Sequence, residues 1–169
     1  MPTNLELLID HYDSGHLSRR ELLRALAMLA VPSTLASAEP KVGAAKLINH
    51  ATLYVRDVDQ SRAFYQRLFG MPVLTAQPPG FNLRVGDGFI GLYPIDPGEP
   101  PRIDHVCFGV DHFDADAAQR KLAAEGVAAT IRVRGETKEL YFTDPNAIRI
   151  QLQDVRYRGG VGPLGDRNP

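Results

Sequence analysis

INHATLYV at residues 48–55 and IDHVCFGV at residues 103–110 are near-repeats, with His50 and His105 at the same place in each. Each copy alternates in the manner of a β-strand and is followed by a turn and a helical stretch. Histidine is the most common metal ligand in proteins, and a duplicated strand brings duplicated side chains to one centre. The repeat therefore predicts two copies of one module that share a histidine-containing site.

Gross composition sets the class of protein. The chain has 169 residues, 44% of them hydrophobic, and a net charge of −1. These values predict one domain with short additions, and nothing in them indicates a nucleic acid as partner. Cys107 is the only cysteine, which excludes an intrachain disulfide. No apolar run reaches the roughly 18 residues that a membrane-spanning helix needs, so we expect no stable membrane anchor.

Periodicity divides the chain into four parts. Residues 1–38 are helical in pattern, 39–46 read as a linker, 47–154 contain the repeat, and 155–169 form an aperiodic tail. Both halves of the repeat, 47–98 and 101–154, follow the order β-α-β-β-β, which predicts an α+β fold: two βαβββ modules forming a cupped mixed sheet, preceded by an N-terminal helical segment. We expect the tail to be disordered or loosely draped; the alternative is that it closes over a pocket or a partner subunit.

Strand alternation separates an aliphatic face from a chemically active one. The aliphatic faces are expected to lie under the helices. The other face predicts the lining of a cavity, and an ordinary solvent-exposed sheet face is the alternative. The side chains on it are His50, Tyr54, Phe89, Tyr93, His105, Cys107, Arg149 and Gln151.

Several motifs in residues 47–154 resemble the vicinal oxygen chelate superfamily, which includes glyoxalase I, bleomycin-resistance proteins and extradiol dioxygenases. They are NHATLYV from Asn49, SRAFY from Ser61, LFGM from Leu68, IDHV from Ile103 and LYFTDPN from Leu140. The resemblance implies metal ligands on four strands, at positions that correspond here to His50, Gly91, His105 and Gln151. Gly91 has no ligating side chain and Gln151 replaces the usual glutamate, which disfavours glyoxalase-type lyase or isomerase chemistry.

The resemblance to extradiol dioxygenases implies a three-ligand site made of His50, His105 and Gln151. Tyr141 matches that group's active-site tyrosine and would be a hydrogen-bonding partner or proton donor. We expect a divalent metal, with Fe(II) or Mn(II) favoured over Zn(II), and a small oxygenated substrate, such as an aromatic one, bound through two oxygens. Tyr54, Phe89, Tyr93, Cys107 and Arg149 are candidates for substrate contact. A non-catalytic binding or resistance protein is the alternative, and a homodimer is expected because family members commonly pair.

The N-terminal segment has two interpretations. SRRELLR, from Ser18, resembles a twin-arginine export motif, and Ala36-Ser37-Ala38 resembles a cleavage site. This predicts a periplasmic or otherwise exported protein. Ser18 and Glu21 also have the spacing of a helix capping box, so a packed helical hairpin in a cytoplasmic protein is the alternative.

Overall fold

The computed structural model describes residues 4–30 and 39–169. It divides into two compact units, residues 1–39 and 40–169. No helix among the described residues is long and apolar enough to cross a membrane. The proposed cleavage pattern at residues 36–38 lies outside the described residues.

The first unit is a helical hairpin. Helix α1 (Asn4–Asp13) and helix α2 (Arg19–Ala30) are joined by a turn in which Gly15 has a φ of 77°. The capping box forms as the spacing predicts, since the backbone N–H of Ser18 donates to Glu21 Oε2 at 2.9 Å and the backbone N–H of Glu21 donates to Ser18 Oγ at 3.3 Å. Ser18 and Glu21 therefore cap the N-terminus of α2.

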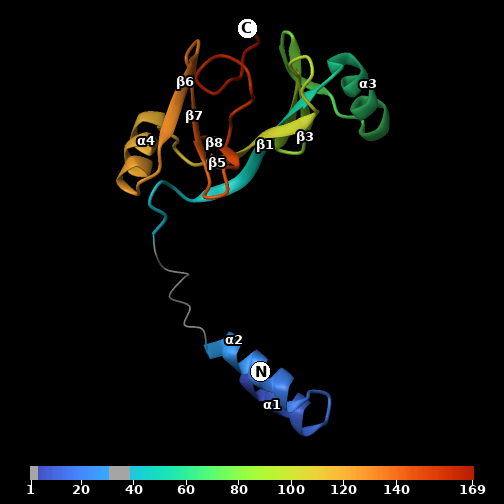
Figure 1. The fold of residues 1–169 in the computed structure, drawn as a ribbon, viewed down its shortest axis with the longest axis vertical. Coiled ribbons are helices and arrows are strands. Elements are labelled where there is room, and N and C mark those ends of the chain that lie inside the picture. Colours follow the sequence, from blue (N-terminus) through green and yellow to red (C-terminus); the bar gives the residue numbers. More distant parts are fainter. Residues whose placement is uncertain (1–3, 31–38) are drawn as a thin grey trace. The chain divides into compact units, whose positions relative to one another are not determined.

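The second unit contains one eight-stranded sheet built from two βαβββ copies (Figure 1). The first copy is β1 (Ala45–Val55), α3 (Val58–Phe69), β2 (Val73–Gln77), β3 (Gly80–Val85) and β4 (Gly88–Pro94). The second is β5 (Arg102–Val110), α4 (Ala115–Ala124), β6 (Ala129–Arg134), β7 (Thr137–Thr143) and β8 (Arg149–Asp154). The predicted fold class is confirmed.

The strand order β2-β3-β4-β1-β5-β8-β7-β6 is symmetric about its centre. There β1 and β5 pair antiparallel, while β1 pairs parallel with β4 and β5 pairs parallel with β8. The two histidine-bearing strands are therefore neighbours at the base of a curled sheet, and the outer strands of each copy rise as walls (Figure 1).

The two helices cover the sheet unequally. Helix α4 begins at the N-cap Asp114 and buries Ala115, Ala118 and Leu122 in a core with Leu140 and Leu152. Helix α3 begins at the N-cap Asp57 and ends at Gly70, whose φ is 65°, yet it buries no residue. The prediction that helices cover the aliphatic faces is thus right for α4. Helix α3 lies against β3 and β4, which carry the fully buried Leu83 and Leu92, but its own side chains are at most partly buried.

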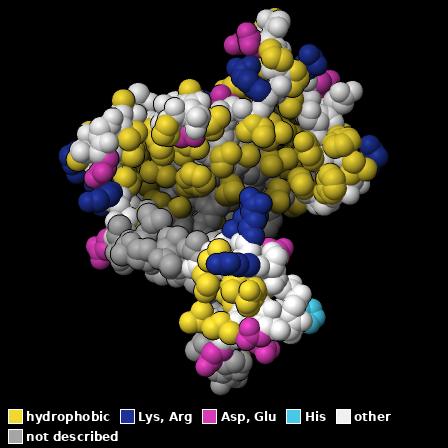
Figure 2. All heavy atoms as spheres, turned by 60° about the horizontal axis from the view of Figure 1, so that its bottom comes forward, with side chains coloured by type: hydrophobic (Ala, Val, Ile, Leu, Met, Phe, Trp, Pro, Cys, Tyr) yellow, Lys and Arg dark blue, Asp and Glu magenta, His cyan; other side chains and the backbone are white. Residues whose placement is uncertain are grey.

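Hydrophobic side chains are exposed on the outside of this unit, and Figure 2 shows a broad face of them. Among them are Ile48 in β1, Ile103 in β5 and Ile148 just before β8, with exposed fractions of 64%, 63% and 54%. Exposed apolar areas of this kind are typical of surfaces that another protein covers.

The prediction of a disordered tail is wrong; of the two alternatives, a pocket or a partner subunit, the tail closes over the pocket. Residues 155–169 lie across the open side of the cup and bond to both modules. On the first module, Asn49 Nδ2 donates to the carbonyl of Tyr157 at 3.2 Å and Asn82 Nδ2 to that of Gly159 at 3.1 Å. On the second, Thr137 Oγ1 donates to the carbonyl of Gly162. The tail lacks the period of a helix or strand because it forms a compact loop. Its backbone bonds partly to itself, as in the bridge between Val161 and Arg167, and partly to side chains of the sheet.

Candidate metal centre and cavity

Two β-bulges aim the histidines into the cup. Between β1 and β5 the register passes from Ile48↔Phe108 to His50↔Cys107, and from Thr52↔His105 to Leu53↔Ile103. One extra residue, Asn49 in β1 and Asp104 in β5, therefore precedes each histidine. Bulges of this kind re-aim side chains next to active sites.

Each extra residue holds the histidine that follows it. Asn49 Oδ1 lies 2.9 Å from His50 Nδ1, and Asp104 Oδ2 lies 2.6 Å from His105 Nδ1. Asn49 donates its own amide hydrogens to tail carbonyls, so its oxygen accepts from His50. Burial raises the pKa of Asp104, but the hydrogen bond from His105 and the charge of Arg149 outweigh burial and lower it overall. Both Nδ1 atoms are therefore donors.

The other ring nitrogens, the Nε2 atoms of His50 and His105, converge with the side-chain oxygen of Gln151. His50 Nε2 lies 3.2 Å from His105 Nε2 and 3.1 Å from Gln151 Oε1. An imidazole whose single hydrogen is on Nδ1 presents a lone pair at Nε2. Burial and then His105 hold the pKa of His50 well below its usual range, which opposes a proton in this gap. Gln151 Nε2 is buried without a hydrogen-bond partner, so the amide oxygen is turned toward the histidines at a cost.

Three convergent lone pairs fit a divalent cation. Donors bonded to one iron- or zinc-sized ion at about 2.1 Å lie roughly 3 Å apart, which is how far His50 Nε2 lies from each of the other two donors. Ligating histidines usually donate their other N–H to a carboxylate or carbonyl, as His50 and His105 do. Among the described residues no three of His, Cys, Asp and Glu gather as a metal site, because the third donor here is an amide.

The fourth family position is closed. Thr52 pairs with Gly91 in β4 as Cys107 pairs with Gln151 in β8, so Gly91 is the symmetry counterpart of Gln151. A Cβ at position 91 would lie 2.9 Å from Tyr93 Cε2 and 3.0 Å from Asn82 Oδ1. Neighbouring side chains occupy the space that a fourth ligand would need, which leaves three protein donors.

A buried carboxylate that the sequence analysis did not single out lies in the wall of the cup. Glu139 in β7 is 2% exposed. Tyr157 Oη donates to Glu139 Oε1 at 2.9 Å, and Tyr141 Oη donates to Glu139 Oε2 at 3.0 Å. Arg134 donates to Oε1 at 3.1 Å, and Arg132 Nε lies 3.5 Å from Oε2. We name Glu139 with Tyr141, Tyr157, Arg132 and Arg134 the Glu139 network.

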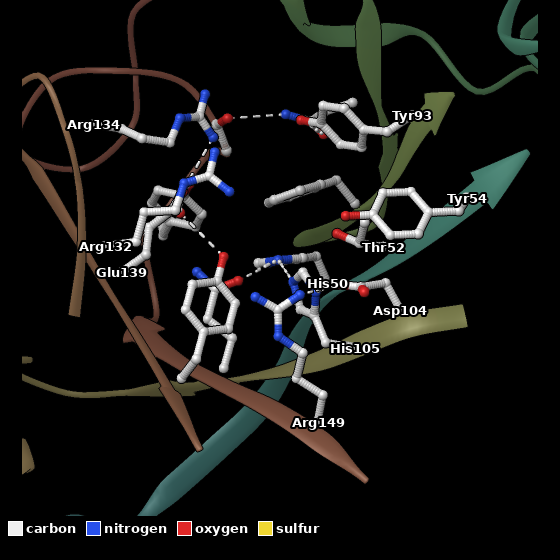
Figure 3. A pocket seen from close by; sticks show the side chains of 16 residues that line it. His50, Thr52, Tyr54, Tyr93, Asp104, His105, Arg132, Arg134, Glu139 and Arg149 are labelled. Atoms are coloured by element: carbon white, nitrogen blue, oxygen red, sulfur yellow. Dashed lines mark hydrogen bonds and ion pairs between the residues drawn. The ribbon is translucent and has the colours of Figure 1, made fainter. Parts of the chain in front are cut away.

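These groups enclose a cavity of about 100 Å³, with room for several waters or a small organic ligand (Figure 3). At its base lie His50, which stacks on Phe89 at 4.2 Å between ring centroids, and His105. Three guanidinium groups face it against two carboxylates, so its ionic lining is net positive. These charged groups are Asp104, Arg132, Arg134, Glu139 and Arg149.

The cavity brings together most of the predicted site residues. His50, His105, Gln151, Tyr141, Tyr54, Phe89, Tyr93 and Arg149 all line it. Cys107 does not: it is fully buried beneath the base, and burial raises the pKa of its thiol well above the usual range. Its predicted contact with substrate is corrected accordingly. The error arose because alternation alone cannot distinguish a side chain that reaches the cavity from one beneath it.

Apart from Thr52, Asn82 and Asp104, the cavity residues that were absent from the predicted set fall into two groups. Arg132 and Arg134 alternate in β6, and Thr137, Glu139 and Tyr141 alternate in β7, so extending the face of Tyr141 backwards would have identified Glu139. Tyr157 and Gly159 come from the aperiodic tail, where no such signal exists.

The family model of the Glyoxalase/Bleomycin resistance protein/Dioxygenase superfamily matches residues 47–152, and the chain belongs to this superfamily. The glutathione transferase FosA of Serratia marcescens is 27% identical over 110 residues, which cover 62% of this chain and 78% of that protein.

Solved structures share the fold. Methylmalonyl-CoA epimerase from Mycobacterium tuberculosis has a TM-score of 0.54 and 21% identity, and the match covers 65% of this chain and 88% of that one. The 2,3-dioxygenase LapB from Pseudomonas sp. KL28 has a TM-score of 0.57 and 19% identity, covering 67% and 42%. Homoprotocatechuate 2,3-dioxygenase from Brevibacterium fuscum has a TM-score of 0.55 and 22% identity, covering 76% and 37%. The match thus spans less than half of either dioxygenase chain.

Proposed function

We propose that this chain is a metal-dependent vicinal oxygen chelate enzyme with dioxygenase-like chemistry, acting on a small aromatic substrate that chelates through two oxygens. The observation that carries this proposal is the convergence of His50 Nε2, His105 Nε2 and Gln151 Oε1 in a buried base, with both Nδ1 atoms already committed as donors. The family and the extradiol dioxygenases among its structural neighbours support it.

The charge of the donor set supports an anionic substrate. Two neutral imidazoles and an amide cancel none of the charge of a divalent ion, and the ionic lining is itself net positive. A catecholate, or a similar anion that chelates through two oxygens, would restore the charge balance. Fe(II) or Mn(II) is the proposed metal, because a site of nitrogen and oxygen donors with open positions suits these ions, and Zn(II) is the alternative.

A bound metal would supply Lewis acidity and a template for the two substrate oxygens. The chain's own residues would bind and orient the substrate and shield it from water. Phe89 and Tyr54 offer aromatic surface, and Arg149, whose guanidinium lies 4.3 Å over the ring of Tyr141, offers positive charge at the rim of the cavity. The tail contributes Tyr157 and Gly159 to the lining, where they would shield a bound substrate from water on that side.

Oxygen uptake tests the function. Fe(II)-loaded protein supplied with 3,4-dihydroxybenzoate or a related catechol should consume O₂ and give a ring-opened product that contains both oxygen atoms. The variants His50→Ala and His105→Ala should do neither. Tyr65→Phe, in α3 outside the cavity, is the matched control and should behave as wild type.

A non-catalytic binding or resistance protein is the second candidate, and one observation favours it. No carboxylate stands at any of the four family ligand positions, which are His50, Gly91, His105 and Gln151. Saturable binding of the catechol without O₂ uptake, in protein that retains metal, would support this alternative over the enzyme.

A further inference from the structure

Glu139 accepts the hydroxyl hydrogens of Tyr141 and Tyr157. A tyrosine hydroxyl has one hydrogen to donate and lone pairs to accept with. Tyr141 donates its hydrogen to Glu139 Oε2 at 3.0 Å, and Tyr157 donates its hydrogen to Glu139 Oε1 at 2.9 Å. An ionised carboxylate only accepts, so neither bond can reverse its direction. Toward the cavity, both phenol oxygens can therefore offer lone pairs alone.

The phenols keep these hydrogens. Burial, followed by the charge and hydrogen bonding of Glu139, raises the pKa of Tyr141 and of Tyr157 well above the usual range. Arg134 and Arg132 in turn stabilise the carboxylate form of Glu139 from the other side.

The hydroxyl hydrogen of Tyr93 is also committed to an acceptor of the protein. Tyr93 donates to Asn82 Oδ1 at 3.2 Å, while Asn82 uses its amide hydrogens on Thr75 and on the carbonyl of Gly159. The strong donors that line the cavity are the guanidinium groups of Arg132, Arg134 and Arg149 (Figure 3). Three arginines of the lining donate, and three of its four phenols accept. Together they favour a ligand that joins an anionic group to a hydrogen-bond donor; Tyr54, the fourth phenol, takes no part in these bonds.

We propose that the cavity takes a hydroxylated aromatic carboxylate, and that Glu139 sets this preference as a positioning residue by holding Tyr141 and Tyr157 as acceptors. The inference deepens the proposed function and rests on it, because it takes the same cavity as the substrate site. Of the two roles expected for Tyr141, hydrogen-bonding partner or proton donor, the proposal takes the first. A ligand hydroxyl can donate to Tyr141, whereas the oxygen of a methoxy group at that position would meet only another acceptor.

The test is a selectivity ratio in the full chain, measured by calorimetry after chelator treatment and again after loading with Zn(II). The probes are 3- and 4-hydroxybenzoate, the corresponding methoxybenzoates, and the neutral hydroxybenzamides. Wild type should bind the better hydroxybenzoate about tenfold more tightly than its methoxy counterpart, the worth of roughly one hydrogen bond. The neutral amide should bind at least tenfold more weakly than the acid.

Two variants separate the effect of hydrogen-bond direction at Tyr141 from the effect of cavity shape. In Tyr141→Phe the acceptor is lost, so the hydroxy-to-methoxy ratio should fall toward one. In Glu139→Gln the new amide nitrogen should avoid Arg134, the nearer guanidinium, and take the place of Oε2. Tyr141 then accepts from the amide and turns its hydrogen into the cavity, so methoxybenzoate should gain at least fivefold relative to hydroxybenzoate. Tyr65→Phe, outside the cavity, should keep the wild-type ratio.

The outcomes are distinct from those of the proposed function. Loss of metal binding or of O₂ uptake leaves the ratio in chelator-treated protein readable. A wild-type ratio near one, the same ratio in wild type and both variants, or no binding of any hydroxybenzoate would overturn the inference. Folding of each variant is checked by its thermal midpoint, and if Glu139→Gln does not fold, Tyr141→Phe alone decides.

Discussion

His50 Nε2 faces His105 Nε2 at 3.2 Å, although 55 residues separate the two histidines in the chain. Two imidazoles would not normally turn their Nε2 lone pairs toward each other in a buried site. They do so here because Asn49 and Asp104, the extra residues of two β-bulges, hold the Nδ1 atoms on the far side. The bulges thus set the chemistry of the base of the cup as well as its shape.

Asp104 should matter for metal affinity without touching the metal. Removing its carboxylate in Asp104→Ala frees the ring of His105 to rotate and to change its tautomer. We expect metal binding to weaken about ten- to a hundredfold, measured by competition with a chromogenic chelator. Arg149→Gln keeps the bond between Asp104 and His105 and should have a clearly smaller effect. Equal affinities of Asp104→Ala and wild type would contradict this role.

The docked tail should be sensitive to a single methyl group. Gly159 has a φ of 81°, and a Cβ there would lie 2.3 Å from Asn82 Nδ2 and 2.8 Å from Phe89 Cζ. Gly159→Ala should lower the free energy of unfolding by about 2 kcal/mol or more, since overpacking adds to backbone strain. Urea denaturation measures this.

Gly98→Ala is the matched control for the tail. Gly98 has a φ of 93°, but a Cβ there would have no neighbouring atom within 4 Å, so the substitution should cost only backbone strain, about 1 kcal/mol. Equal costs at positions 98 and 159 would show that the tail does not pack over Asn82 and Phe89.

The sequence was sufficient for the fold because the two modules repeat. Strand alternation and the pair of glycine- and proline-bounded helices predicted both βαβββ units, and the repeat itself predicted that His50 and His105 meet. The bulges could not be predicted, because INH and IDH also fit an unbroken alternation. Nor could the place of Tyr157, since long-range hydrogen bonds from Asn49, Asn82 and Thr137 fix the tail and leave no local pattern.

We propose a homodimer that buries the exposed isoleucines Ile48 and Ile103 of the two central strands. Light scattering at micromolar concentration should give twice the chain mass. The double variant Ile48→Ser and Ile103→Ser should be monomeric while keeping its circular dichroism spectrum, because both side chains are more than half exposed in the single chain. Leu23→Ser, in the N-terminal unit, should stay dimeric. A single-chain mass for wild type would rule the dimer out.

We also propose export through the twin-arginine pathway. Arg19 and Arg20 open α2, and residues 40–169 form a compact unit by themselves. Replacing both arginines with lysine should retain the protein in the cytoplasm, as cell fractionation would show, and a chain that starts at Glu39 should fold and keep its metal. An unchanged location, together with a melting temperature lowered by several degrees in the shortened chain, would favour the packed hairpin of Leu22, Leu23 and Leu26 instead.

Metal retention tests the central claim most directly. Protein loaded with Fe(II), Mn(II) or Zn(II) and desalted should keep close to one equivalent per chain by elemental analysis. His50→Ala and His105→Ala should each abolish retention, and Gln151→Glu should tighten binding by adding the missing negative charge to the donor set. If wild type and His50→Ala keep the same trace amount, the three convergent acceptors are not a metal site and the account fails.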